Sequence, residues 1–169
     1  FSKIDGVIRT EVGYCGGNSS STTYKEVCTG KTNHAEVVKL EFDDKVISFK
    51  KILDLFFKMH DPTQKDMQFP DVGTQYRSEI FYETDEQKKE AEEVLNEKNK
   101  EFNGKIQTNI SKVKNYCKKN TDFLKTLPKR EIVCGYAEIL KHSLISNKNF
   151  FKYLNKNINK ILNLKSPFI

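Results

Sequence analysis

The sequence predicts an α+β fold in which helices pack on a two-layer mixed sheet. Short segments with apolar residues at every second position alternate along the chain with two longer segments whose apolar residues follow the helical period. Strands interleaved with helices in this way favour a sheet covered by helices. The chain has 169 residues, of which 37% are hydrophobic and 11% aromatic, so its apolar mass suits one ordinary globular domain and exceeds that of a disordered chain.

Two strands and a helix are predicted in the first part of the chain. Val7–Tyr14 has the pattern of a strand that ends in the glycine-rich turn 13–17, and Ala35–Phe42 has the pattern of a second strand with one apolar face. Ser48 is a good N-cap for a helix that ends before Pro62, because the residue preceding a proline disfavours helical angles. The apolar positions expected to be buried are Val38, Leu40 and Phe42 in the strand and Phe49, Ile52, Leu53, Phe56 and Phe57 in the helix.

A strand, a helix and another strand follow. Arg77–Glu83 predicts a short strand. Thr84 and Gln87 form a capping box, which predicts a helix over Asp85–Phe102 that is closed by a glycine. Lys105–Ile110 alternates as a strand after it. The positions of this helix that should face inward are Ala91, Val94 and Leu95.

Charge divides the chain into two regions. The net charge of +6 comes from residues beyond 103, where Lys and Asn dominate, so we expect a first domain over 1–112 and a basic region over 113–169. An amphipathic helix within Leu144–Leu164 should cover its own domain, although a partner or an acidic membrane surface are alternatives. The basic region lacks the aromatic and arginine pattern of a nucleic-acid module, so no nucleic acid is expected. No apolar run approaches the ~20 residues of a membrane span, and four cysteines suit free thiols in the cytoplasm.

Glu36 is the most informative single residue. It shares the phase of the apolar positions of its strand, so it should begin that strand on the buried face. A carboxyl group desolvated there would suit a general acid. The alternative is that Glu36 lies at the strand end and turns to water or to a Lys. His34, two residues earlier, is expected to form a hydrogen bond at the strand entry rather than to bind a metal.

Five segments resemble, in order and spacing, the signature of the peptide methionine sulfoxide reductase A family. Together they cover residues 1 to about 110, and five collinear matches are hard to obtain by chance. The matching segments are Gly6-Val7 with Val12–Gly17, Thr23–Cys28 with Gly30 and Thr32, His34–Val38, Ile47–Phe49 with Phe56 and His60–Gln64, and Asp71–Ser78.

The resemblance implies reduction of the S-epimer of methionine sulfoxide, free or in proteins. A cysteine thiolate attacks the sulfoxide sulfur while an acid protonates the departing oxygen, and a second thiol and then thioredoxin, or dithiothreitol, restore the enzyme. Residue by residue, Glu36 matches the family's proton donor, Tyr24 and Tyr76 its two phenol donors, and Asp71 its buried second carboxylate. Tyr14 is expected to pack in the turn. The resemblance implies no bound cofactor, no metal ion and a monomer.

The thiols are the point at which the chain departs from the family pattern. The family's nucleophile is the Cys of a Gly-Cys-Phe-Trp-Gly segment, and residues 1–169 contain neither this segment nor any Trp. We therefore expect the nucleophile to lie outside these residues, which would be a fragment without reductase activity of their own. The candidate thiols within the chain are Cys117, as a resolving thiol, and Cys134, which a predicted strand over 131–136 would present before a glycine. Cys28 is expected in the core and Cys15 as a bystander.

An alternative function belongs to a different class. A non-catalytic relative would bind Met or Met-sulfoxide segments through Tyr24, Tyr76 and Glu36, or would act through its basic region. Turnover of a methyl sulfoxide with dithiothreitol separates this alternative from the enzyme, because product formation requires a working thiol.

Overall fold

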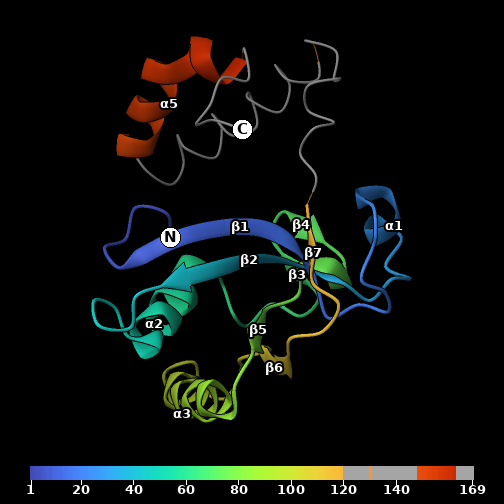
Figure 1. Ribbon diagram of the computed structural model, residues 1–169, viewed down its shortest axis with the longest axis vertical. Coiled ribbons are helices and arrows are strands. Elements are labelled where there is room, and N and C mark those ends of the chain that lie inside the picture. The colour runs from blue at the N-terminus through green and yellow to red at the C-terminus, as the bar shows by residue number, and fades with distance from the viewer. Residues whose placement is uncertain (120–129, 131–147, 163–169) are drawn as a thin grey trace. The chain divides into compact units, whose positions relative to one another are not determined.

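The computed structural model describes residues 1–119, 130 and 148–162, and the chain forms two compact units, Phe1–Lys119 and Asn120–Ile169 (Figure 1). The first unit confirms the α+β fold class. Its elements in chain order are β1 (Val7–Cys15), α1 (Tyr24–Cys28), β2 (Ala35–Phe42), α2 (Phe49–Met59), β3 (Met67–Gln68), β4 (Asp71–Val72), the 3₁₀ helix η1 (Thr74–Tyr76), β5 (Glu79–Tyr82), α3 (Asp85–Glu101), β6 (Asn109–Lys112) and β7 (Cys117–Lys118).

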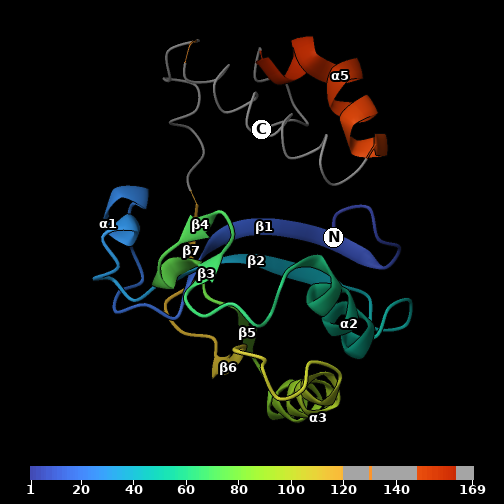
Figure 2. The same ribbon diagram turned by 180° about the vertical axis from the view of Figure 1, so that it is seen from behind.

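The main sheet has the strand order β2-β1-β7, with both pairs antiparallel. The long strands β1 and β2 run side by side in both views (Figures 1 and 2). Tyr14 lies opposite Glu36 on one side and opposite Cys117 on the other. Directly opposed residues project from the same face of a sheet, so these three side chains form one row across it.

The core lies between α2, α3 and the parallel pair β5–β6. Ser48 caps α2 by accepting a hydrogen bond from the amide of Lys51, and the predicted capping box of Thr84 and Gln87 begins α3. The apolar positions of α2 and α3 that were predicted to face inward do so. Buried members of the cluster are Leu53, Phe57, Ile80, Ala91 and Val94, and Phe49, Phe56, Leu95, Ile106 and Ile110 pack against them.

A chain of hydrogen bonds ties the end of α2 to β5 and β6. The His60 Nδ1 atom lies 2.8 Å from the carbonyl oxygen of Phe56, and Nε2 lies 2.7 Å from Ser78 Oγ. A carbonyl oxygen only accepts, so Nδ1 carries the proton and Nε2 accepts from Ser78, whose Oγ in turn accepts from Thr108 at 2.7 Å. Burial lowers the pKa of His60, since the charged ring would lose its hydration. His60 is therefore a neutral structural link.

The apolar face predicted for β2 is only partly covered. Phe42 stacks on Phe49 with ring centroids 6.3 Å apart, but Val38 keeps 49% of its surface exposed and so corrects the expectation that it is buried. Its cross-strand neighbour Val12 is also 47% exposed. The reason lies in the packing, because α2 and α3 bury their apolar faces against each other and β5 rather than against this part of the sheet.

Several boundaries differ from the sequence-based expectation. The strand predicted over 105–110 is observed as β6, four residues further on, and β7 pairs with β1 at residues 117–118, so the first unit runs seven residues past 112. In the second unit α5 (Lys148–Leu162) lies within the predicted amphipathic segment, and its Leu154 is buried. The predicted strand 131–136, with Cys134, falls outside the described residues. None of the helices that the structure describes is long and apolar enough to span a membrane.

Candidate active site

The predicted site residues come from α1, β2, β4 and η1, which gather at the end of the main sheet remote from the N-terminus (Figures 1 and 2). Tyr24 is the first residue of α1. Thr23 caps this helix, because its side chain accepts from the amide of Glu26 while the Glu26 carboxylate accepts from the amide of Thr23 at 2.7 Å. The Thr-x-x-Glu spacing is the sequence signal for this helix, which was not predicted.

Glu36 follows the first residue of β2 and is partly buried, as its phase predicted. Its carboxylate forms an ion pair with Lys119, whose Nζ lies 3.4 Å from Oε1 and 3.5 Å from Oε2. The alternative expected from the sequence, in which Glu36 pairs with a Lys, is therefore observed. Glu36 nevertheless lies among the other predicted site residues. Lys119 itself was not predicted as a site residue, since nothing in the local sequence distinguishes it from the other lysines of the basic region.

Both predicted carboxylates, Glu36 and Asp71, affect the pKa of Tyr76. Burial, followed by the negative charges of Glu36 and Asp71, raises the pKa of Tyr76. For Tyr24 a hydrogen bond with Cys28 is the main cause of a raised pKa, and Tyr76 and Glu36 add to it. Both phenols thus keep their protons at neutral pH and remain donors.

Asp71 corrects one expectation. It was matched to a buried carboxylate, but it is exposed on the β3–β4 hairpin, next to Val72, which is 72% exposed. Each strand of that hairpin has only two residues, and no further strand in the described part of the chain pairs with it, so the hairpin is too small to bury its side chains. The negative charge of Asp71 still contributes to the raised pKa of Tyr76. Tyr24, Glu36 and Tyr76 lie near enough to one another for their electrostatic effects to be felt among all three.

Tyr14 is buried between Glu36 and Cys117 in the row that these three side chains form across the main sheet, rather than merely packed in a turn. It is 2% exposed, and its hydroxyl group has no hydrogen-bond partner among the described residues. Burial, followed by the negative charge of Glu36, raises the pKa of Tyr14 to about 12. Tyr14 was expected to pack in the glycine-rich turn, but the pairing of β1 with β2 and β7 places it between Glu36 and Cys117 instead.

Cys28 lies at this site and not in the core. Its neighbour Val27 is 1% exposed, but Cys28 is exposed at the end of α1 and interacts with the phenol of Tyr24. Helical geometry explains the difference, since successive residues point about 100° apart and only one of the two faces inward. Cys15 is the buried thiol: burial raises its pKa, and Sγ donates to the carbonyl oxygen of Lys114 at 3.4 Å.

Cys117 lies on the face of the sheet that carries Glu36, one strand away from it, which is the position of a candidate resolving thiol. Burial raises the pKa of its thiol. Sγ lies 3.9 Å from Nε2 of His34, and this Nε2 is 2.9 Å from the carbonyl oxygen of Ser19. The carbonyl oxygen fixes the proton on Nε2, so His34 donates and cannot take the proton of the thiol through this atom. The prediction that His34 forms a hydrogen bond at the strand entry is confirmed.

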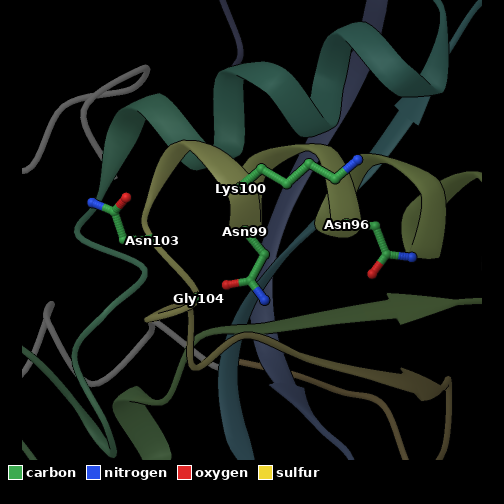
Figure 3. Close-up of a pocket in the computed structure, with 5 residues that line it drawn as sticks. All are labelled: Asn96, Asn99, Lys100, Asn103 and Gly104. Atoms are coloured by element: carbon green, nitrogen blue, oxygen red, sulfur yellow. The ribbon is translucent and has the colours of Figure 1, made fainter.

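A surface hollow among the described residues lies elsewhere. It lies at the C-terminal end of α3 and is lined by Asn96, Asn99, Lys100, Asn103 and Gly104 (Figure 3). Asn99 stabilises the C-terminal end of α3, because its carbonyl oxygen accepts from the amide of Gly104 at 2.8 Å and its Oδ1 atom accepts from the amide of Ile106 at 3.2 Å. The pocket holds no thiol and no carboxylate. At the site of Glu36, Tyr24 is 48% exposed, whereas the side chains of Lys119 and Glu36 are 24% and 28% exposed.

Comparison with known proteins decides the family. The profile described as peptide methionine sulfoxide reductase matches residues 1–153. The chain belongs to this family. The match continues beyond residue 112, so the family resemblance extends into the region whose composition is basic.

Individual members of the peptide methionine sulfoxide reductase family agree. The enzyme MsrA of Pelagibacter ubique is 62% identical over 117 residues, which are 69% of this chain and 80% of that protein. Mxr1 from Saccharomyces cerevisiae in its reduced form is similar in structure, with a TM-score of 0.66 and 37% identity over 69% of this chain and 68% of that one. Mxr1 in complex with Trx2 has a TM-score of 0.51 and 26% identity, over 70% of this chain and 66% of that one.

Proposed function

We propose that the protein reduces methionine-S-sulfoxide, free or in proteins, to methionine, and that Tyr24, Glu36 and Tyr76 receive the sulfoxide oxygen. The reaction is inferred from family membership. The observation that carries the site is the convergence of two phenols and a carboxyl group, drawn from three elements, at one end of the sheet.

These three groups match what the reaction demands. The sulfoxide oxygen gains negative charge as a thiolate adds to the sulfur, and hydrogen-bond donors stabilise charge at the place where it develops. The phenols of Tyr24 and Tyr76 keep their protons because neighbouring groups raise the pKa of each. Glu36, whose resting carboxylate is paired with Lys119, takes up a proton from solvent before the reaction. It then delivers this proton to the departing oxygen, which becomes the hydroxyl of a sulfenic acid on the attacking cysteine, while methionine leaves as the sulfide.

The thiol cycle requires partners for that sulfenic acid. Cys117 supports a resolving role by its position on the face of Glu36, and a resolving thiolate would displace water from the sulfenic acid to form a disulfide. A thioredoxin would then reduce this disulfide with its own two thiols. The complex of the similar protein Mxr1 with Trx2 supports a thioredoxin as the reductant.

Binding and turnover of the two sulfoxide epimers test the proposal. Residues 1–169 should bind N-acetyl-methionine-S-sulfoxide methylamide in preference to the R-epimer. A chimera that adds the amino-terminal segment of the MsrA of Pelagibacter ubique should consume the S-epimer with dithiothreitol. In this chimera Glu36→Gln should lower turnover by about 10²-fold or more, as expected for loss of a general acid. Binding without turnover in the chimera would instead favour the non-catalytic relative.

A further inference from the structure

The ammonium group of Lys119 lies inside the proposed site. It contacts both carboxylate oxygens of Glu36, at 3.4 and 3.5 Å. The two side chains are 24% and 28% exposed, whereas those of the surface pair Lys50 and Glu97 are 48% and 57% exposed. Because water screens an enclosed pair less than an exposed one, the contact between Lys119 and Glu36 should count for more than a surface ion pair.

The same ammonium group also faces the aromatic rings of the site. Its Nζ atom lies 5.2 Å from the ring centroid of Tyr24 and 5.6 Å from that of Tyr14. A cation within about 6 Å of a ring face is attracted to it. Lys119 therefore contacts three neighbours from three different elements, α1, β1 and β2, and its ammonium group bridges Tyr24 and Glu36.

The backbone of Lys119 is fixed, so this placement is not that of a free side chain on the surface. Its amide donates to the carbonyl oxygen of Val12 at 3.0 Å, which continues the pairing of β7 with β1. Alternation along the strand then sends Cys117 and Lys119 to the face of Glu36 and sends Lys118 to the opposite face. There Lys118 pairs with Glu11 at 2.9 Å.

We propose that Lys119 is a positioning residue of this site, whose ammonium group holds the Glu36 carboxyl group against Tyr24 in the geometry that receives the sulfoxide oxygen. This rests on the proposed function. Without the ammonium group, the carboxyl group of Glu36 would lose a hydrogen-bond partner, and the ring of Tyr24 would lose its contact with the residue that follows β7. The acid and the first phenol would then no longer be held together.

Lys119→Met removes the charge and keeps an apolar side chain of similar length, and Lys119→Arg keeps the charge. Lys118→Met is the matched control, because it removes an ion pair from the adjacent residue on the opposite face. The chain with ¹³C-labelled Tyr and Glu reports on the site by NMR. The Tyr24 ring and Glu36 carboxyl signals should move in Lys119→Met, return toward their original positions in Lys119→Arg and stay in place in Lys118→Met. Lys119→Gln serves as the uncharged variant if Lys119→Met does not fold.

Binding of N-acetyl-methionine-S-sulfoxide methylamide, followed in the same spectra, gives the functional readout. We expect roughly five- to tenfold weaker binding in Lys119→Met and a change of less than about twofold in Lys119→Arg and Lys118→Met. Unmoved Tyr24 and Glu36 signals, equal effects of Lys118→Met, or unchanged binding despite moved signals would each overturn the proposal. If the original chain does not prefer the S-epimer, the proposed function fails, and the signals alone then decide whether Lys119 positions Glu36.

Discussion

The imidazole ring of His34 lies directly against the backbone of Gly17. A Cβ atom built on Gly17 would be 2.1 Å from Nδ1 and 2.2 Å from Cε1 of this ring, so no side chain fits between them. His34 is 1% exposed and held by its hydrogen bond to the carbonyl oxygen of Ser19, which leaves the ring little room to withdraw. The close approach fixes the turn after β1 to the start of β2, next to Glu36.

Gly17→Ala should therefore destabilise the protein by about 2–3 kcal/mol, as overpacking of a buried site does. Urea denaturation measures the loss. Gly104→Ala is the control: Gly104 has φ +74° and nothing within 4 Å of an added Cβ, so only the backbone strain remains, at about 1 kcal/mol. An equal loss in both variants would show that the ring of His34 can move aside.

Tyr14→Phe should stabilise the protein by about 1 kcal/mol, because it removes a buried hydroxyl group that has no partner in the described part of the chain. Tyr116→Phe is the matched variant of opposite sign. The hydroxyl of Tyr116 donates to Glu11 at 2.8 Å, so its removal should cost about 1 kcal/mol. Thermal and urea unfolding of both variants test the pair. A destabilised Tyr14→Phe would mean that the hydroxyl of Tyr14 has a partner in solution.

Stability should fall as the pH is lowered below 6.5, through the neutral link at His60. Burial lowers the pKa of His60 in the folded chain, so the unfolded chain binds more protons between that lowered value and the ordinary 6.5. The contribution is complete above pH 6.5 and is lost as the pH falls through the lower value. Urea unfolding between pH 7.5 and about 5 measures the slope. His60→Gln should be less stable overall but should lose this part of the pH dependence, and an unchanged slope would assign it to another group.

The described thiols should react with a disulfide reagent in a definite order. Cys28 is exposed, Cys117 is intermediate and Cys15 is buried. Burial also raises the pKa of Cys117 and of Cys15, which lowers their thiolate fraction at neutral pH. Labelling followed by peptide mass spectrometry should find Cys28 modified first and Cys15 last. Cys15 reacting before Cys28 would contradict the burial of the end of β1.

The elements that could be predicted from the sequence are those long enough to repeat a pattern. β1, β2, α2 and α3 each span at least eight residues, and the two long helices also carry cap residues at Ser48 and Thr84. The strands β3, β4 and β7 have two residues each, which is too few for any period to register. β6 begins four residues later than predicted, because alternation shows that a strand exists without fixing where its pairing begins.

The site was predictable to the extent that local sequence marks its residues. The phase of Glu36 along β2 led to its position at the edge of the buried face. The burial of Asp71 was predicted wrongly, because it depends on how much structure surrounds a hairpin, and no local pattern records that. Lys119 and the exposure of Cys28 were missed for a related reason. The position of Lys119 depends on the pairing of β1 with β7, which are over a hundred residues apart in sequence. The exposure of Cys28 depends on which way each side chain of the short helix α1 points.

The short helix α1 carries a phenol of the site on five residues, far fewer than a helix needs to persist by itself in water. The capping box between Thr23 and Glu26 thus sustains the helix that presents Tyr24, although neither side chain is among those proposed to receive the sulfoxide oxygen. Genetic variation at these two positions would alter substrate affinity while leaving every proposed oxygen-binding group in place. Natural variants or engineered libraries screened only at those groups would overlook this pair.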